Sequence, residues 1–205
     1  MEMAILMGEE LPKIYVARHG ETAWSLSGQH TGLTDLPLTE RGELNAKRLG
    51  DRLKGITFTK VFTSPLQRAY KTCELAGFEN VSEIDPNLVE WDYGEYEGHR
   101  TAEILAKRPD WQLFRDGCPG GESPAEVAKR ADSVIAKIRE VNGNVLIFSS
   151  GHFIRVLAVR WIGLEPTITC KYFMLSTASL CALGYKHDLS NPVITLWNDD
   201  HHVVP

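Results

Sequence analysis

Residues 13–22 read KIYVARHGET, a short apolar run that ends in an arginine, a histidine and a glycine. The run over residues 13–17 predicts a buried strand, and a histidine directly after such a strand is held in a fixed orientation. The neighbouring Arg18 can bind phosphate oxygens with paired N–H groups, and Gly20 allows a ligand to approach the backbone closely. Taken alone, Arg18-His19-Gly20 is weak evidence for a site, because a single histidine at a strand end is more often structural.

Strand-like and helix-like segments alternate along most of the chain. Strands are predicted at residues 13–17, 60–63, 81–84, 144–149, 178–185 and 193–197, and helices at 39–54, 64–76, 101–107, 111–115, 123–141 and 153–162. This alternation predicts one three-layer α/β domain over residues 13–205 with a mostly parallel sheet, preceded by an N-terminal extension of residues 1–12. Because sites in such folds form where the carboxyl ends of strands meet the following loops, the chemistry should collect at one end of the sheet.

The overall composition limits the classes of partner. With 205 residues and a net charge of −5, the chain suits a single globular domain whose surface does not favour nucleic acid, so an anionic substrate needs a local cluster of cations. No apolar run approaches the roughly 20 residues that span a bilayer, and the N-terminus lacks a signal-peptide pattern. The widely spaced cysteines are interpreted as reduced thiols. We therefore expect a cytoplasmic protein that binds neither nucleic acid nor a membrane.

Two further stretches place charged residues where such a cluster would need them. Arg68, in the sequence TSPLQRA of residues 63–69, lies on the first turn of a predicted helix, where free N–H groups and the helix dipole attract anions. Glu90 stands among aromatic residues, an environment that suits a proton donor. The alternative for each is an exposed surface charge, which fits Glu95 and Glu97 better than Glu90.

The three motifs, in this order and at this separation, resemble the histidine phosphatase superfamily, also called the phosphoglycerate-mutase-like family. The resemblance runs from residue 13 to about residue 199 and also includes LTERG at residues 38–42. The stretches EWDYGEYEG at 90–98 and DGCPGGES at 116–123 look like phosphatase branches of the family, which include broad-specificity acid phosphatases and sugar bisphosphatases. The implied fold is a three-layer α/β/α sandwich.

The resemblance also implies a mechanism, residue by residue. His19 would attack phosphorus as a neutral imidazole and form a phosphohistidine. Arg18 and Arg68 would hold the phosphoryl oxygens, and Glu90 would protonate the leaving oxygen and later accept a proton from water. No metal or other cofactor is implied, because the arginines supply the positive charge. The positions that the resemblance places along the substrate or its phosphate are Ser25, Thr31, Gly32, Ser150, Gly151 and His152.

The sequence departs from the family pattern after the late strand. The family carries a second catalytic histidine directly before a glycine, and the register set by Gly151 and Arg155 places Ser150 at that position. His152 falls two residues later. Three interpretations stay open: His152 shares the charge-stabilising role while Ser150 donates a hydrogen bond; the enzyme is slow, since one such donor is typically worth ~10²–10³ in rate; or the protein only binds phosphorylated ligands. We favour the first two together.

A second departure bears on the reaction. Mutases of the family carry asparagine at the position of Ser25 and an inserted basic segment with paired arginines, whereas residues 98–121 contain no adjacent arginine pair. We therefore expect a phosphatase rather than a phosphoglycerate mutase, acting on small phosphorylated metabolites such as sugar or sugar-acid phosphates. A monomer and a homodimer both remain open. His30 is expected either to contact substrate or to lie on the surface, and His201-His202 to be solvated rather than to bind metal.

Overall fold

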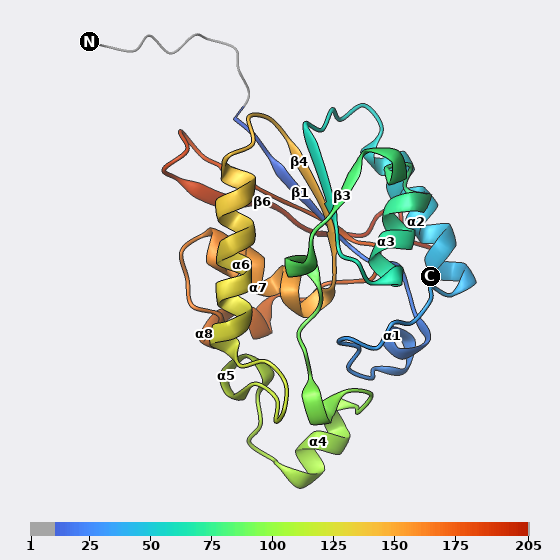
Figure 1. Cartoon of the computed structure of the whole chain (residues 1–205), viewed down its shortest axis with the longest axis vertical. Coiled ribbons are helices and arrows are strands. Elements are labelled where there is room, and N and C mark those ends of the chain that lie inside the picture. The colour runs from blue at the N-terminus through green and yellow to red at the C-terminus, as the bar shows by residue number, and fades with distance from the viewer. Residues whose placement is uncertain (1–10, 205) are drawn as a thin grey trace.

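The computed structural model describes residues 11–204, so the predicted N-terminal extension lies outside it except for Leu11 and Pro12. Within these residues six strands form one sheet in the order β3-β2-β4-β1-β5-β6 (Figure 1). Neighbours from β3 to β1 run parallel, whereas β5 pairs antiparallel with β1 and with β6. The mostly parallel sheet is confirmed. The strands are β1 (Ile14–Arg18), β2 (Lys60–Thr63), β3 (Ser82–Ile84), β4 (Val145–Ser149), β5 (Leu180–Tyr185) and β6 (Pro192–Asp199).

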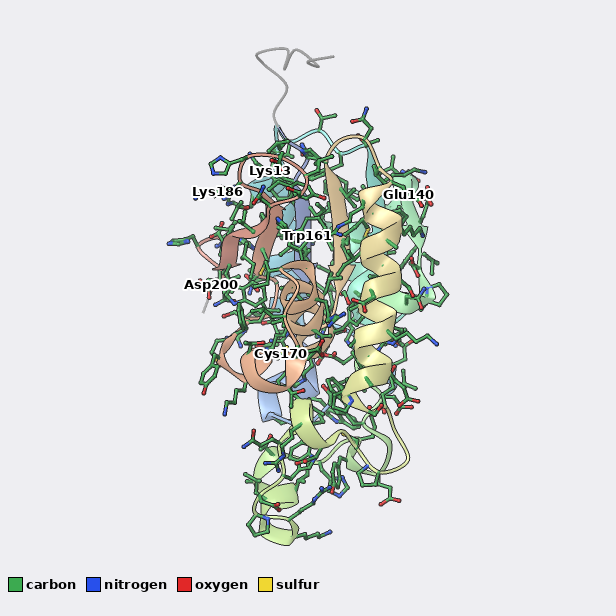
Figure 2. All side chains as sticks on the ribbon, turned by 90° about the vertical axis from the view of Figure 1, so that its left-hand side faces the viewer. Lys13, Glu140, Trp161, Cys170, Lys186 and Asp200 are labelled. Atoms are coloured by element: carbon green, nitrogen blue, oxygen red, sulfur yellow. The ribbon has the colours of Figure 1, made fainter. Side chains whose placement is uncertain are left out.

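Helices cover both faces of the sheet, which confirms the three-layer architecture. One face carries α2 (Glu40–Leu53) and α3 (Gln67–Leu75), and the other carries α6 (Pro124–Arg139) and α7 (Gly151–Trp161). Figure 2 looks onto the second face, with α6 and α7 in front of the strands. The central strand β4 is buried along its whole length, as its uninterrupted apolar sequence requires of a strand covered on both sides.

Capping residues explain where two long helices begin. The Thr39 side chain accepts a hydrogen bond from the backbone N–H of Gly42 at the start of α2, and Ser123 forms a reciprocal capping box with Glu126 at the start of α6. Both starts agree with the prediction to within one residue.

Two helix starts differ from the prediction. Helix α3 begins at Gln67 rather than at Ser64, because the Ser64 N–H bonds to the Phe148 carbonyl and keeps the chain extended beyond β2. Helix α7 begins at Gly151, two residues earlier than expected, because the Glu90 side chain accepts hydrogen bonds from N–H groups of its first turn. Both differences arise from contacts with residues distant in sequence.

Short elements gather beyond the carboxyl ends of the parallel strands, at the bottom of Figure 1. They include α1 (Ala23–Ser27), α4 (Thr101–Lys107), α5 (Leu113–Asp116) and α8 (Pro166–Thr169), together with single 3₁₀ turns at Pro86–Leu88, Gly94–Tyr96 and Cys170–Tyr172. A further 3₁₀ turn, Glu79–Val81, leads into β3 at the opposite end of the sheet. The four cysteines are free and buried. In the part of the chain that the structure describes, no helix is long and apolar enough to cross a membrane.

Candidate active site

A cavity of about 220 Å³ opens where β1 and β4 end and α7 begins. This is the end of the sheet where the sequence predicted the chemistry. A larger hollow of about 340 Å³, at the amino ends of β1 and β4, contains none of the predicted site residues. Of those residues, the cavity is lined by Arg18, His19, Ser25, Thr31, Glu90, Gly151 and His152, whereas Gly32, Arg68 and Ser150 do not line it.

The backbone and the ring of His19 are both held in place. Its N–H donates to the Ser149 carbonyl, and its own carbonyl accepts from the Ala178 N–H. The ring Nδ1 lies 2.7 Å from the carbonyl oxygen of Gly20. Because a carbonyl only accepts hydrogen bonds, Nδ1 carries the proton of the neutral ring and Nε2 keeps its lone pair. That tautomer is the one a nucleophilic Nε2 requires.

The environment also keeps the His19 ring neutral. The side chain is 3% exposed. Burial, followed by the positive charges of Arg68 and Arg18, lowers the pKa of His19 well below its ordinary value of 6.5. Gly20 is needed next to it, since a Cβ at this position would lie 2.6 Å from the carbonyl oxygen of Gly42 in α2. The close contact of Gly20 with α2 thus helps to fix the loop that carries the histidine.

Arg18 presents a charged group to the cavity. Its Nη1 donates to the Leu175 carbonyl, while its Nε is buried and has no hydrogen-bond partner within residues 11–204. Burial lowers the pKa of Arg18 to about 10, so the guanidinium is still charged at neutral pH. Gly151 lies directly against it, because a Cβ there would come within 3.1 Å of Nε. Because Arg18 lines the cavity, its positive charge would attract an anion there.

Arg68 is placed differently from the expectation of a direct phosphate contact. It lies on the first turn of α3, as predicted, but its side chain is fully buried. Its Nη1 and Nη2 donate to the carbonyl oxygens of Thr31, Gly32 and Thr34. The guanidinium therefore holds the loop that follows α1, and its charge still acts on the His19 ring.

Glu90 joins the cavity to the start of α7. Its Oε1 accepts hydrogen bonds from the N–H groups of Trp91 at 2.9 Å and Phe153 at 2.8 Å, and its Oε2 accepts from the N–H of His152 at 3.0 Å. A carboxylate has about four acceptor positions, so Oε2 retains capacity toward the cavity. The negative charge is also favoured by the N-terminus of the helix.

Ser25, Thr31 and Gly32 shape the loop side of the site. The Ser25 hydroxyl is engaged in the capping box with Thr22 at the start of α1, although the residue borders the cavity. The Gly32 N–H donates to the Glu97 carboxylate, and a Cβ at Gly32 would lie 2.6 Å from the Trp91 carbonyl oxygen. Gly32 therefore lets this loop pack against the segment that follows Glu90.

Ser150 and His152 follow β4 but face different surroundings. Ser150 is the N-cap of α7 and fully buried, and its Oγ has no hydrogen-bond partner in the described part of the chain. It does not reach the cavity, so in this arrangement it does not present a donor there. His152 does line the cavity, and its Nδ1 lies 2.5 Å from the Tyr93 Oη.

Arg155 is a cavity residue that was given no role from the sequence. Arg155 had served only to set the register, yet its partly buried guanidinium lines the cavity and its Nε has no partner within residues 11–204. Its position four residues after Gly151 on one helix face was the available signal. Tyr93 also lines the cavity, and His30 does so with 8% of its surface exposed, so the surface alternative for His30 is wrong.

A second cavity of about 210 Å³ adjoins the first. The two share His30, Thr101, His152 and Arg155. The second cavity is further lined by Trp111, Phe114 and Lys171, which come from the region of α5 and from the turn after α8. Within residues 11–204, no group of three or more His, Cys, Asp or Glu residues is arranged to hold a metal ion.

The buried histidines lead to a prediction about titration. Burial is the main cause of the lowered pKa of His19, His30 and His152, and the value for His30 is about 4. These rings bind a proton only well below pH 6.5, so their ¹⁵N chemical shifts should show no transition between pH 8 and pH 6.5. Nuclear magnetic resonance of protein with ¹⁵N-labelled histidine will test this. A midpoint near pH 6.5 for His19 would contradict the neutral nucleophile.

Comparison with known proteins finds relatives that match most of the chain. An acid phosphatase from Mycobacterium tuberculosis is 41% identical over 185 residues, covering 88% of this chain and 90% of that protein. A sedoheptulose 1,7-bisphosphatase from Saccharomyces cerevisiae is 35% identical and covers 90% of this chain and 84% of that protein. The solved structure of an open reading frame from Mycobacterium tuberculosis has a TM-score of 0.87 at 37% identity, covering 93% of this chain and 99% of that chain.

The family model agrees with these relatives and with the architecture. It matches residues 14–200, which include every predicted site residue, and it describes branch 1 of the superfamily that the sequence motifs resemble. The chain therefore belongs to the histidine phosphatase superfamily.

Proposed function

We propose that this protein is a metal-independent phosphomonoester hydrolase that forms a phosphohistidine on His19 and acts on small phosphorylated metabolites such as sugar or sugar-acid phosphates. The observation that carries the proposal is the 2.7 Å contact between Nδ1 of His19 and the Gly20 carbonyl oxygen, because it assigns the ring proton to Nδ1 and leaves Nε2 free in a cavity that Arg18 lines. The names of the relatives, an acid phosphatase and a sugar bisphosphatase, support this reaction class.

The reaction proceeds in two displacements. Nε2 of His19 forms a bond to phosphorus while the bond from phosphorus to the leaving oxygen breaks, and Glu90 gives that oxygen a proton. Water then attacks the phosphoryl group, Glu90 takes up its proton, and the N–P bond breaks to release phosphate. Arg18 binds the phosphoryl oxygens. Arg68 contributes its charge and holds the loop carbonyls at residues 31–34.

The adjoining cavity supports the substrate class. The reacting phosphate occupies the first cavity, beside His19 and Glu90, and the rest of the substrate extends into the second. Trp111 and Phe114 offer apolar surface to a carbon chain, while Arg155 and Lys171 offer positive charge. A sugar phosphate or sugar-acid phosphate with a second anionic group has the matching chemistry.

The proposal also covers where the protein acts, what it binds and its oligomeric state. The protein acts in the cytoplasm, without a nucleic acid, a membrane or a cofactor, and its oligomeric state is a monomer or a homodimer. A phosphoglycerate mutase is disfavoured because residues 98–121 lack an adjacent arginine pair, and without such groups to retain the substrate water reaches the phosphoenzyme. A protein that only binds phosphorylated ligands is disfavoured because His19, Arg18 and Glu90 line one cavity.

A phosphate-release screen tests the function. Purified protein is incubated with sugar phosphates, sugar bisphosphates, sugar-acid phosphates and nucleotides, and interconversion of 2- and 3-phosphoglycerate is measured beside the screen. We expect phosphate release from the sugar and sugar-acid esters, with interconversion at least about tenfold slower. Efficient interconversion would make the protein a mutase, and tight binding of these esters without release would make it a phospholigand-binding protein.

A further inference from the structure

His152 and Tyr93 form a hydrogen-bonded pair in the wall of the cavity. The Tyr93 Oη and the His152 Nδ1 are 2.5 Å apart, and the tyrosine side chain is 1% exposed. The His152 ring also packs edge-on against Phe114, with ring centroids 5.5 Å apart. Its backbone N–H is bound to Glu90. The ring is therefore held by Tyr93 and Phe114, and its backbone is held by Glu90.

The direction of the hydrogen bond follows from the surroundings. Burial raises the pKa of Tyr93 well above 10, so the phenol keeps its proton. Burial, together with the charges of Arg155, His30 and Arg18, lowers the pKa of His152 well below 6.5, so the imidazole is neutral. Within residues 11–204, the Tyr93 hydroxyl has no other hydrogen-bond partner. The hydroxyl donates to Nδ1, and the ring proton is consequently on Nε2.

The Nε2–H group of His152 then has no partner of its own. No group within residues 11–204 bonds to it, and the ring lines the same cavity as His19 and Arg18. A neutral N–H donor facing an anion site is the kind of group that stabilises charge developing on a phosphoryl oxygen. Ser150, at the position of the family's second histidine, is buried away from the cavity and does not supply such a donor there.

We propose that His152 is a catalytic residue that donates its Nε2–H to a phosphoryl oxygen in place of the missing second histidine, and that Tyr93 is the positioning residue that fixes this tautomer. The inference rests on the proposed phosphohydrolase function of His19. No covalent step is added: the donor binds the oxygen more strongly in the transition state than in the bound substrate, so its loss lowers kcat more than it raises KM.

A matched pair of substitutions at His152 tests the donor. The amide N–H group of glutamine can reach the place of Nε2, whereas asparagine is shorter and places its amide near Nδ1. We expect His152→Asn to lower kcat by a factor of about 10²–10³. The kcat of His152→Gln should be at least about tenfold higher than that of His152→Asn. Inhibition by orthovanadate, which resembles the transition state, should weaken in His152→Asn and recover in His152→Gln. Equal losses in both variants would overturn the proposal.

Tyr93→Phe tests the positioning role. The phenylalanine ring keeps the packing and removes only the donor to Nδ1, so kcat should fall about threefold to tenfold, the effect of one ordinary hydrogen bond. In ¹⁵N spectra the two His152 nitrogens should change their shifts toward a mixture of tautomers. The matched control is Tyr185→Phe, because Tyr185 lies on β5 and outside this cavity. This substitution should leave kcat and the ¹⁵N shifts of His152 unchanged. An unchanged His152 spectrum in Tyr93→Phe would end the assignment.

Ser150→His tests whether His152 already supplies the hydrogen-bond donor of the family's second histidine or whether that donor is absent. If His152 already supplies the donor, Ser150→His should raise kcat less than about tenfold in the natural chain. The same substitution should raise kcat by a larger factor in the His152→Asn background. A large gain in the natural chain would show that the donor was missing and overturn the proposal. Melting temperatures identify misfolding at this buried position, in which case the asparagine and glutamine pair decides.

Failure of the inference can be told apart from failure of the proposed function. Labelling of His19 by a ³²P-phosphorylated substrate reports the nucleophile, independently of His152. If His19 is labelled and His152→Asn keeps full activity, only the role proposed for His152 is contradicted. Absence of labelling in the natural chain sinks the phosphohydrolase proposal and this inference with it.

Discussion

Replacing His19 with alanine will reduce phosphate release by roughly 10⁴ to 10⁶-fold, the range seen when an enzyme loses its nucleophile, and will abolish phosphoenzyme labelling. The reason is geometric: within the cavity, His19 holds an unprotonated ring nitrogen toward the anion site through the Nδ1–H bond to Gly20. Acid-quench trapping of ³²P-labelled protein and continuous phosphate assays measure the two losses separately.

The control for this substitution is His187→Ala. His187 is exposed in the turn between β5 and β6, outside the cavity, so the change removes a histidine without touching the site. Turnover and labelling should both survive it. Turnover that survives His19→Ala as well would end the nucleophile assignment and require a different attacking group.

Replacing Glu90 with glutamine should lower kcat for a sugar phosphate by about 10²–10⁴, the usual contribution of a general acid and base. The loss should be much smaller for p-nitrophenyl phosphate, because nitrophenolate leaves without needing a proton. Comparing kcat for the two substrates isolates proton donation from binding. An equal loss on both would instead assign Glu90 a structural or electrostatic role.

Glu90→Gln also perturbs the fold in a predictable way. The new amide nitrogen cannot accept the hydrogen bonds that the oxygen it replaces now accepts, which are those from the N–H groups of Trp91 and Phe153 at Oε1 or the one from His152 at Oε2. The free energy of unfolding should therefore fall by about 1–3 kcal/mol. Glu95→Gln is the control: Glu95 is exposed and lies outside the cavity, so activity and stability should stay unchanged.

The sequence was sufficient for the fold because its signals were local. The apolar strand before Arg18, the Ser123 capping box and the continuous apolar run of β4 each depend on a few neighbouring residues. Where the prediction was wrong, distant contacts decided the structure. The start of α3 depends on a bond from Ser64 to Phe148, and the start of α7 depends on Glu90.

In the site, too, local sequence signals predicted some positions and contacts between distant residues determined the others. Motif spacing places His19 and Glu90 in one cavity, because each follows a strand or short segment that ends at the same side of the sheet. Motifs do not reveal what a long side chain binds. The N–H groups of Arg68 donate to the carbonyl oxygens of a loop. Arg155 lines the cavity only because of how α7 packs in the fold. The catalytic roles of these residues stay predictions.

The contacts of Glu90 have a consequence for motion during turnover. In the proposed mechanism, the carboxyl group that exchanges a proton with the substrate is the one that also holds the first turn of α7. A protonated carboxyl group accepts hydrogen bonds more weakly than a carboxylate. In the proposed mechanism, Glu90 has lost its proton in the phosphoenzyme and regains it when water attacks. The first turn of α7 should therefore tighten and loosen once in every catalytic cycle, in step with the chemistry.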